Sequence, residues 1–167
     1  MLELHSKRLR ILPLNAENLK NLIDDPKLLA QQLSLTSSDN FLDSALQQAL
    51  EIRLSKLLGD KENYIWYTNW LIVLKSHNCS IGGIMLKGTP NNKGEVIIGY
   101  YTLSDYQGNG YMTETIVVLK DWLLSQAHVK SVVADTEKNN FASHRVLEKA
   151  GAVFYKETAD LYYWRFI

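Results

Sequence analysis

The sequence predicts a single α+β domain in which a mixed, mostly antiparallel central sheet is flanked by helices. Three patterns along the chain point to this class. The first third shows helical spacing of apolar residues, the middle shows short apolar runs separated by polar turns, and the last third alternates between the two patterns. A chain of 167 residues without a linker or low-complexity tract fits one domain, residues 1–167.

The amino-terminal part begins with a predicted strand and continues with helices. Leu9 and Ile11 alternate with polar residues, which predicts a strand that reaches about Leu12. Asn15 is a helix-capping residue for the segment that follows it. Pro26 either ends this helix or begins a second short one, because proline is favoured at the first helical position.

A long helix is predicted next. The apolar spacing changes from Ser38 onwards, and the pattern stops at Gly59. The apolar face of this helix is expected to contain Leu42, Ala45, Leu46, Ala49, Ile52 and Leu57. We find no pattern typical of a catalytic or metal-binding site in this half of the sequence.

The middle of the chain predicts an antiparallel meander. Its three apolar runs are residues 70–75, 81–86 and 95–103. Short polar connections join them, and such connections favour antiparallel neighbours.

The last third predicts one βαβα unit and two closing strands. The helix that follows the third run carries Met112, Ile116, Leu119 and Leu123 at spacings of four, three and four. A strand from Val129 to Asp135 comes next, and a helix after Asn140 ends at Gly151, a typical helix stop.

The charge and cysteine content argue against several functional classes. The 18 Lys and Arg residues balance the 18 Asp and Glu residues, so no large field attracts nucleic acid or a membrane surface. Cys79 is the single cysteine, which excludes an intramolecular disulfide, and with four His residues it argues against a metal site. Neither a membrane-spanning run nor a signal-peptide pattern occurs, so we expect a reducing, cytoplasmic setting.

The segment Gln107-Gly108-Asn109-Gly110 leads from a predicted strand directly into a helix. Glycines allow a ligand to approach the backbone, and the free N–H groups of a first helical turn attract anionic oxygen. The segment therefore predicts a pyrophosphate site, although a glycine-rich turn that only joins strand to helix has the same sequence. The spacing matches neither a nucleoside triphosphatase loop nor a dinucleotide fingerprint.

Several segments, in order, resemble the GNAT superfamily of N-acetyltransferases, specifically the branch of ribosomal-protein alanine and related acetyltransferases. The similar segments are residues 6–14 (opening strand), 81–83 (third strand), 98–100 with 106–114 (the acetyl-CoA motif), and 140–143 with 146–151 (the next helix and its stop). They extend over nearly the whole chain, and their ordered combination is far more specific than any single segment.

The resemblance implies a GNAT-type sheet and direct transfer of an acetyl group from acetyl-CoA to a primary amine of a peptide N-terminus or a small molecule. Residues 108–112 would hold the pyrophosphate, and the strand 95–103 would splay from its neighbour to admit the pantetheine arm. The residues that the resemblance assigns to the cofactor are Tyr101, Leu103, Gln107, Gly108, Asn109, Gly110, Tyr111, Met112, Asn140 and Ser143.

The chain departs from the family at the two positions where catalytic groups are common. Ile97 stands where a carboxylate often precedes the Ile-Gly-Tyr triplet, and Leu147 stands where many members carry a tyrosine acid. Strand alternation returns Glu95 to the face of Ile97, so Glu95 is a candidate general base, or else a solvated strand end. Ser143, one turn before Leu147, is the candidate acid, or else a hydroxyl bonded to its own helix.

Two further functions stay open at this stage. The chain could be a catalytically weak or inactive CoA-binding module, since Ile97 and Leu147 lack catalytic groups, or a phosphate-binding regulator that uses the same glycine loop. Asp135 and Glu137 are reserve carboxylates for the acceptor. The sequence identifies neither the amine acceptor nor the oligomeric state, and a homodimer is one of the states left open.

Overall fold

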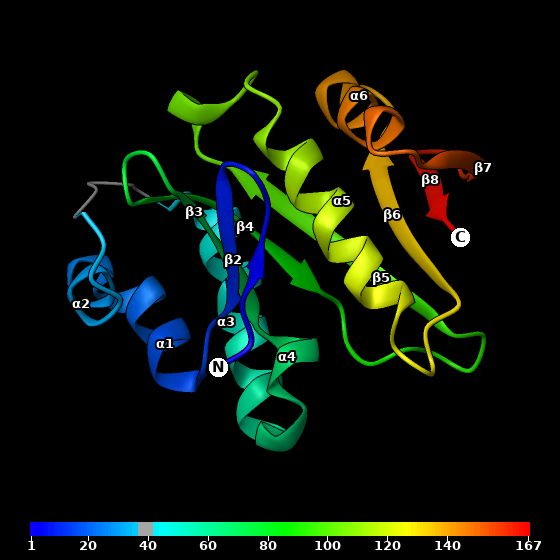
Figure 1. Ribbon diagram of the computed structural model, residues 1–167. Helices are drawn as coiled ribbons and strands as arrows, with labels where there is room; N and C mark the ends of the chain where they lie inside the picture. The colour runs from blue at the N-terminus through cyan, green and yellow to red at the C-terminus, as the bar shows by residue number, and fades with distance from the viewer. Residues whose placement is uncertain (37–41) are drawn as a thin grey trace.

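The computed structural model describes residues 1–36 and 42–167. Within these residues, the strands form one eight-stranded sheet with the order β1-β2-β3-β4-β5-β6-β8-β7 (Figure 1). All neighbouring strands are antiparallel except β5 and β6, so the predicted class is confirmed. The strands are β1 Leu4–His5, β2 Leu9–Pro13, β3 Asn69–Leu74, β4 Cys79–Leu86, β5 Glu95–Thr102, β6 Ser131–Glu137, β7 Val153–Glu157 and β8 Leu161–Phe166.

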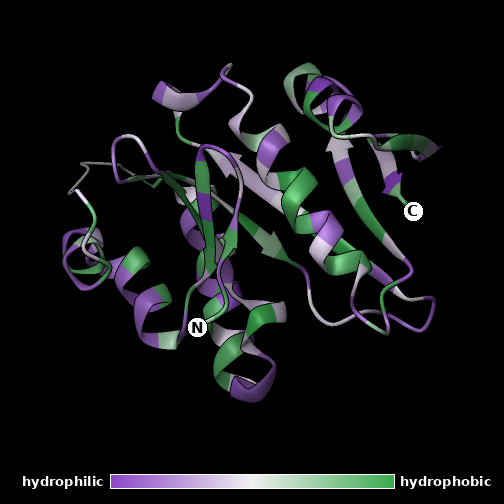
Figure 2. Cartoon of the chain, viewed as in Figure 1, coloured by the Kyte–Doolittle hydropathy of each residue, from purple (hydrophilic) through white to green (hydrophobic). Residues whose placement is uncertain are grey.

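Helices cover both faces of the sheet (Figure 1). Helices α5 and α6 lie on one face, whereas α1, α2 and α3 lie on the other. The described helices are α1 Ala16–Asp24, α2 Pro26–Gln32, α3 Ser44–Gly59, α4 Tyr64–Tyr67, α5 Tyr111–Leu124 and α6 Phe141–Lys149, with the short 3-10 turns η1 Lys61–Asn63 and η2 Ser104–Tyr106. Figure 2 shows the hydrophobic residues along α5 and the central strands.

The central strands are apolar on both faces because both are covered. In β3, Trp70 and Ile72 pack towards α5, while Leu71 and Val73 pack into the cluster formed with α1 and α3. All six β3 residues are buried as a result. The predicted meander is confirmed, since β3, β4 and β5 pair in sequence order.

The caps of the first helices follow the sequence. The Asn15 side chain accepts a hydrogen bond from the N–H of Asn18 at 2.8 Å, so Asn15 caps α1 as predicted. Pro26 begins a second helix, α2, whose cap is Asp25. Strand β1 and helix α4 were not anticipated, since each is too short to show periodicity.

The predicted apolar face of α3 is partly wrong. Ile52 is 52% exposed, whereas the buried residues are Leu50, Arg53 and Leu57. At 100° per residue these three positions form one stripe. Arg53 joins it because its guanidinium donates a hydrogen bond to the buried carbonyl of Leu86 at 3.1 Å. Ser38 lies outside the described residues.

The βαβα unit forms the second half of the sheet. The four predicted apolar residues of α5 are all buried against it: Met112, Ile116, Leu119 and Leu123. Strands β5 and β6 pair in parallel from Glu95 and Ser131 up to Ile98 and Ala134. Beyond that point β5 stays with β4 and β6 stays with β8, so the two strands splay apart (Figure 1).

A search of the described residues finds no helix with the length and apolar content needed to cross a membrane.

Candidate active site

A cavity of about 740 Å³ lies where β5 and β6 splay apart. Its volume is in the range of small-molecule sites. Its lining comes from the end of β5, the segment leading into α5, the side of α6 and the start of α3: Asp43, Tyr100, Tyr101, Thr102, Tyr106, Gln107, Gly108, Gly110, Tyr111, Met112, Thr113, Asn140, Ala142, Ser143, Arg145, Val146 and Lys149. Residues from helices on both faces of the sheet therefore line the cavity.

Glycines shape the wall formed by the start of α5. Gly108 and Gly110 both have a φ of 78°, a left-handed conformation that favours glycine. Gly110 is the residue that caps α5, and a Cβ on Gly108 would meet no atom within 4 Å. The N–H groups of the first helical turn lack helical partners. This wall can therefore bind an anion through backbone N–H groups.

A buttress from the amino terminus holds this segment. The Arg8 Nε atom lies 2.7 Å from a carboxylate oxygen of Glu114, and its Nη1 donates to the carbonyl of Asn109 at 3.0 Å. Burial raises the pKa of Glu114, but hydrogen bonds from Ser6 and Arg8 outweigh it and lower that pKa below its usual value. The arrangement ties the first turn of α5 to the residues that precede β2.

Two amide side chains hold the loop itself in shape. Gln107 donates through Nε2 to the carbonyl of Thr102 at 2.9 Å. Asn109 donates through Nδ2 to the carbonyls of Tyr106 and Gln107 at 3.2 and 3.1 Å. Gln107 also lines the cavity, whereas Asn109 is absent from its lining. The Asn109 side chain therefore stabilises the loop.

Helix α6 forms the opposite wall. Asn140 caps this helix, since its Oδ1 accepts the N–H of Ser143 at 3.2 Å, and both residues line the cavity. Arg145 and Lys149 add two positive charges to the same wall, four residues apart on one helical face. Sequence reasoning missed both, although an i, i+4 pair of cations after a capping Asn is a readable signal.

The hydroxyl groups of Tyr100 and Ser143 lie near each other on the α6 side of the cavity. Burial raises the pKa of Tyr100, and the Ser143 hydroxyl opposes this shift. The Tyr100 hydroxyl is buried and has no partner at full hydrogen-bond geometry among the described residues. A buried polar group of this kind is costly unless a ligand completes it.

Tyr101 points to the other face of the sheet, because neighbouring residues of a strand alternate. Its hydroxyl and the Oδ1 of Asn69 lie directly over Gly83, where a Cβ has no room. Burial raises the pKa of Tyr101, and the Asn69 side chain opposes this rise. Leu103, which the sequence assigned to the cofactor, lines a separate apolar cavity next to Tyr101.

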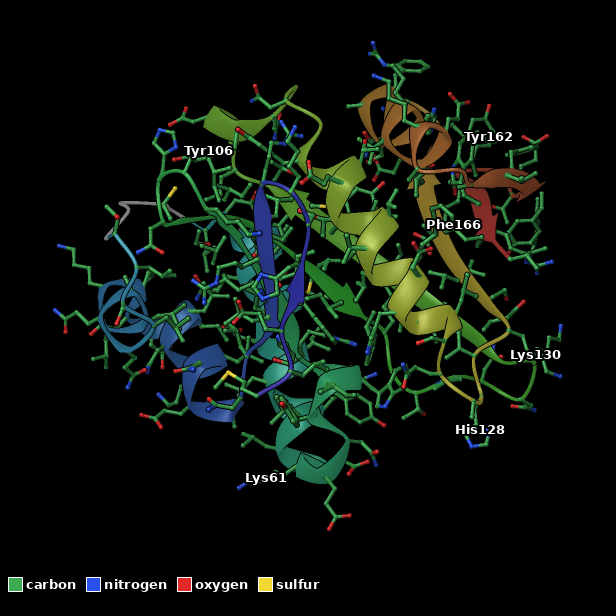
Figure 3. All side chains as sticks on the ribbon, viewed as in Figure 1. Lys61, Tyr106, His128, Lys130, Tyr162 and Phe166 are labelled. Carbon is green, nitrogen blue, oxygen red and sulfur yellow. The ribbon has the colours of Figure 1, made fainter. Side chains whose placement is uncertain are left out.

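The structure does not bring Glu95 to the cavity. Its carboxylate lies 2.9 Å from Nη2 of Arg165 and accepts a hydrogen bond from Asn91 at 3.0 Å. The Asn91 hydrogen bond and the charge of Arg165 lower the pKa of Glu95. Glu95 pairs with Ser131, at the end where β5 and β6 are joined. In Figure 3, Lys130 and His128 mark this end of the sheet, which lies across the molecule from Tyr106.

Four further residues that the sequence analysis singled out are also placed. Leu147 is fully buried in the core, so it contributes no group to the cavity. Met112, in the first turn of α5, lines the cavity but is largely buried. Asp135, one of the reserve carboxylates, lies 3.8 Å from the Nζ of Lys87, and neither Asp135 nor Glu137 is part of the cavity lining.

Comparison with known proteins identifies the family. The model of the acetyltransferase (GNAT) domain matches residues 8–153, so the chain belongs to this family. An uncharacterized N-acetyltransferase of Bacillus subtilis is 30% identical over 101 residues. The alignment covers 60% of this chain and 60% of that relative.

Solved structures share the fold over the whole chain. The ribosomal-protein-S5-alanine acetyltransferase of Vibrio fischeri has a TM-score of 0.72 at 17% identity, with 100% of this chain and 97% of that chain covered. A ribosomal L7/L12 alpha-N-protein acetyltransferase in complex with coenzyme A has a TM-score of 0.71 at 15% identity, covering 99% of this chain and 98% of that one. At such identities the likeness establishes the fold alone.

Proposed function

We propose that this protein is an N-acetyltransferase that transfers an acetyl group directly from acetyl-CoA to a primary amine held in the same complex. The cavity at the splay of β5 and β6 is the observation that carries the proposal. It combines an anion-binding helix start with hydroxyl groups and two cations in one space. Membership of the acetyltransferase (GNAT) family supports it.

The two walls of the cavity suit the charged parts of coenzyme A. The backbone N–H groups between Gly108 and Thr113 would bind the pyrophosphate, aided by the positive end of α5. Arg145 and Lys149 would attract the remaining phosphate. The buttress of Arg8 and Glu114 keeps the helix start in position before the ligand arrives, which reduces the entropic cost of binding.

The proposed reaction forms one bond and breaks another. The amine nitrogen attacks the thioester carbonyl, a C–N bond forms, the C–S bond breaks, and coenzyme A leaves with the sulfur electrons. The amine proton passes to solvent. Because a thiol has a pKa near 8.5, the leaving group needs little acid assistance. Ser143, with Tyr100 beside it, is the group that we assign to proton donation towards the sulfur, and solvent returns a proton to its hydroxyl.

Glu95 is not retained as the general base. The nearest cavity-lining residue on β5 is Tyr100, five residues from Glu95 along the strand and roughly 17 Å away at about 3.3 Å per residue. The ion pair with Arg165 also keeps Glu95 ionised and oriented away from the cavity. Positioning of the two substrates alone supplies a large part of such catalysis, so an amine that arrives neutral needs no dedicated base.

A CoA-binding module without transfer is the second candidate function. It is favoured by the apolar side chains at Ile97 and Leu147, and by the distance of Glu95 from the cavity. In such a protein acetyl-CoA would bind, and no acceptor would be acetylated.

Release of free thiol from acetyl-CoA separates the two functions. The purified protein is mixed with acetyl-CoA and a panel of primary amines and amino-terminal peptides, and products are identified by mass spectrometry. Amine-dependent thiol release with an acetylated product is the expected result. A protein that acetyl-CoA stabilises against heat, but that releases no thiol with any amine, would be the binding module.

A further inference from the structure

A second, apolar cavity of about 40 Å³ adjoins the large one. It lies between α1, α2 and the strands β4 and β5, and the mechanism above does not use it. Its walls include Leu22, Leu29, Ala30 and Leu103. A mostly apolar space of this kind favours an apolar occupant, because water there finds few polar partners.

The two cavities share one lining residue, Tyr101, whose side chain stands on the face of β5 that is turned to α1 and α2. Leu42 lines the apolar cavity, and the next residue, Asp43, lines the large one. Asp43 is therefore the sequence neighbour of a residue that lines the apolar space.

Asp43 gives this side of the large cavity a negative charge. It is the one carboxylate among the described residues that line that cavity, whereas Arg145 and Lys149 lie on the α6 side. One Asp43 oxygen accepts the N–H of Leu46 at 2.7 Å and caps α3. The charges thus separate into a phosphate side and an ammonium side.

We propose that the acceptor is a primary ammonium compound with a small branched aliphatic side chain, bound with its charge at Asp43 and its side chain in the apolar cavity. This inference rests on the proposed function. A water-sized group needs about 10–15 Å³ of such volume, so the cavity admits roughly three or four carbon atoms. An isobutyl group fits this space, and an indole is too large.

Three amides of amino acids test the size of the pocket. Leucinamide, glycinamide and tryptophanamide carry the same α-ammonium group and differ in the side chain. We expect kcat/KM for leucinamide to exceed that for each of the others by about 10- to 100-fold. Glycinamide lacks a side chain to bury, and burial of each methylene contributes about 0.8 kcal/mol, whereas the indole of tryptophanamide is too large for the cavity. Thiol release from acetyl-CoA gives the rates.

Filling the pocket tests its location. Ala30→Leu adds three carbon atoms to the cavity wall, and we expect the ratio of kcat/KM for leucinamide to that for glycinamide to fall at least about 10-fold. Ala127→Leu makes the same change at an exposed site beside His128, at the end of the molecule away from Tyr106 (Figure 3). This control should keep the wild-type ratio.

Removal of the charge tests the ammonium site. Asp43→Asn keeps a side-chain oxygen that caps α3, because Asn is as good a cap as Asp. Titration calorimetry on the CoA-saturated protein should show leucinamide binding weakened by about 5- to 30-fold, with the Kd of acetyl-CoA within about twofold of wild type.

The outcomes distinguish this inference from the proposed function. Absence of acetylation for every amine would overturn both. Acetylation without preference for leucinamide, and with the same ratio in Ala30→Leu, would overturn the pocket assignment and leave the acetyltransferase assignment standing. Unchanged leucinamide binding in Asp43→Asn would overturn the ammonium site.

Discussion

The two ends of β5 are built for different tasks. At Glu95, the closed end, the strand is hydrogen-bonded to β6, and the Glu95 carboxylate is held by Arg165 and Asn91. At Tyr100 and Tyr101, the open end, β6 has turned away from β5, and a cavity occupies the space between the two strands. A carboxylate on the correct face of a strand is thus held in an ion pair at one end, whereas the cavity lies at the end where pairing stops.

The largest expected effect concerns the open end. Gly110→Asp places a carboxylate at the start of α5, where we propose that the pyrophosphate binds. Repulsion between the two negative charges should raise the Kd of acetyl-CoA by at least about 100-fold. Gly110→Asn is the matched control, because Asn has the same size and also tolerates the left-handed backbone. Calorimetry should find its Kd within about tenfold of wild type. Equal affinities of the two variants would contradict the anion-binding assignment.

Ser143→Ala should reduce kcat by about 10- to 100-fold, while the Kd of acetyl-CoA changes by less than about twofold. The loss is moderate because the thiolate is a tolerable leaving group. Steady-state kinetics with a saturating amine measure it. If the change falls on the KM for acetyl-CoA and kcat is kept, Ser143 positions the cofactor and does not donate a proton.

Lys149→Gln should weaken acetyl-CoA binding by about 3- to 10-fold, the size expected when a partly exposed charge contact to phosphate is lost. The same substitution should flatten the dependence of Kd on salt concentration. Lys130→Gln, at the closed end beside Gly94, is the matched control and should bind like wild type. A wild-type salt dependence in Lys149→Gln would remove this residue from the phosphate site.

The smallest effect on activity is expected at the closed end. Glu95→Gln should leave kcat/KM within about twofold of wild type, because its carboxylate does not reach the cavity. A loss of 10-fold or more would restore Glu95 as the base.

The same variant should instead lose a little stability. The pKa of Glu95 is lowered in the folded protein, so its stabilising contribution is present above the unfolded pKa and disappears as pH falls through the folded one. Melting curves should place Glu95→Gln up to about 4 °C below wild type at pH 7, with the difference shrinking at acidic pH. A constant difference across this range would exclude the ion pair as its cause.

Local patterns in the sequence predicted most of the fold. The cap at Asn15, the apolar spacing of α5 and the helix after Asn140 each depend on residues only a few positions apart, and each was confirmed. The face of α3 was misjudged because Arg53 counts as polar in a sequence, although its hydrogen bond to Leu86 allows burial.

Only those features of the site that depend on residues close together in the sequence were predictable. Alternation correctly places Glu95 on the face of Ile97, but it carries no information about where β6 leaves β5. That point depends on pairing between segments more than thirty residues apart. Asp43 was missed for the same reason, since only the tertiary fold brings α3 and α6 to one cavity, whereas Arg145 and Lys149 carry a local signal that was not read.

Hydrogen exchange of the backbone amides, with and without acetyl-CoA, tests most directly whether the ligand binds at the open end of β5. We expect saturating acetyl-CoA to slow exchange in peptides that span residues 107–113 and 140–144, because their N–H groups become bonded or covered. Peptides that span residues 91–97 should exchange at the same rate in both samples. Unchanged exchange at residues 107–113, or slowing centred on residues 91–97, would contradict the account.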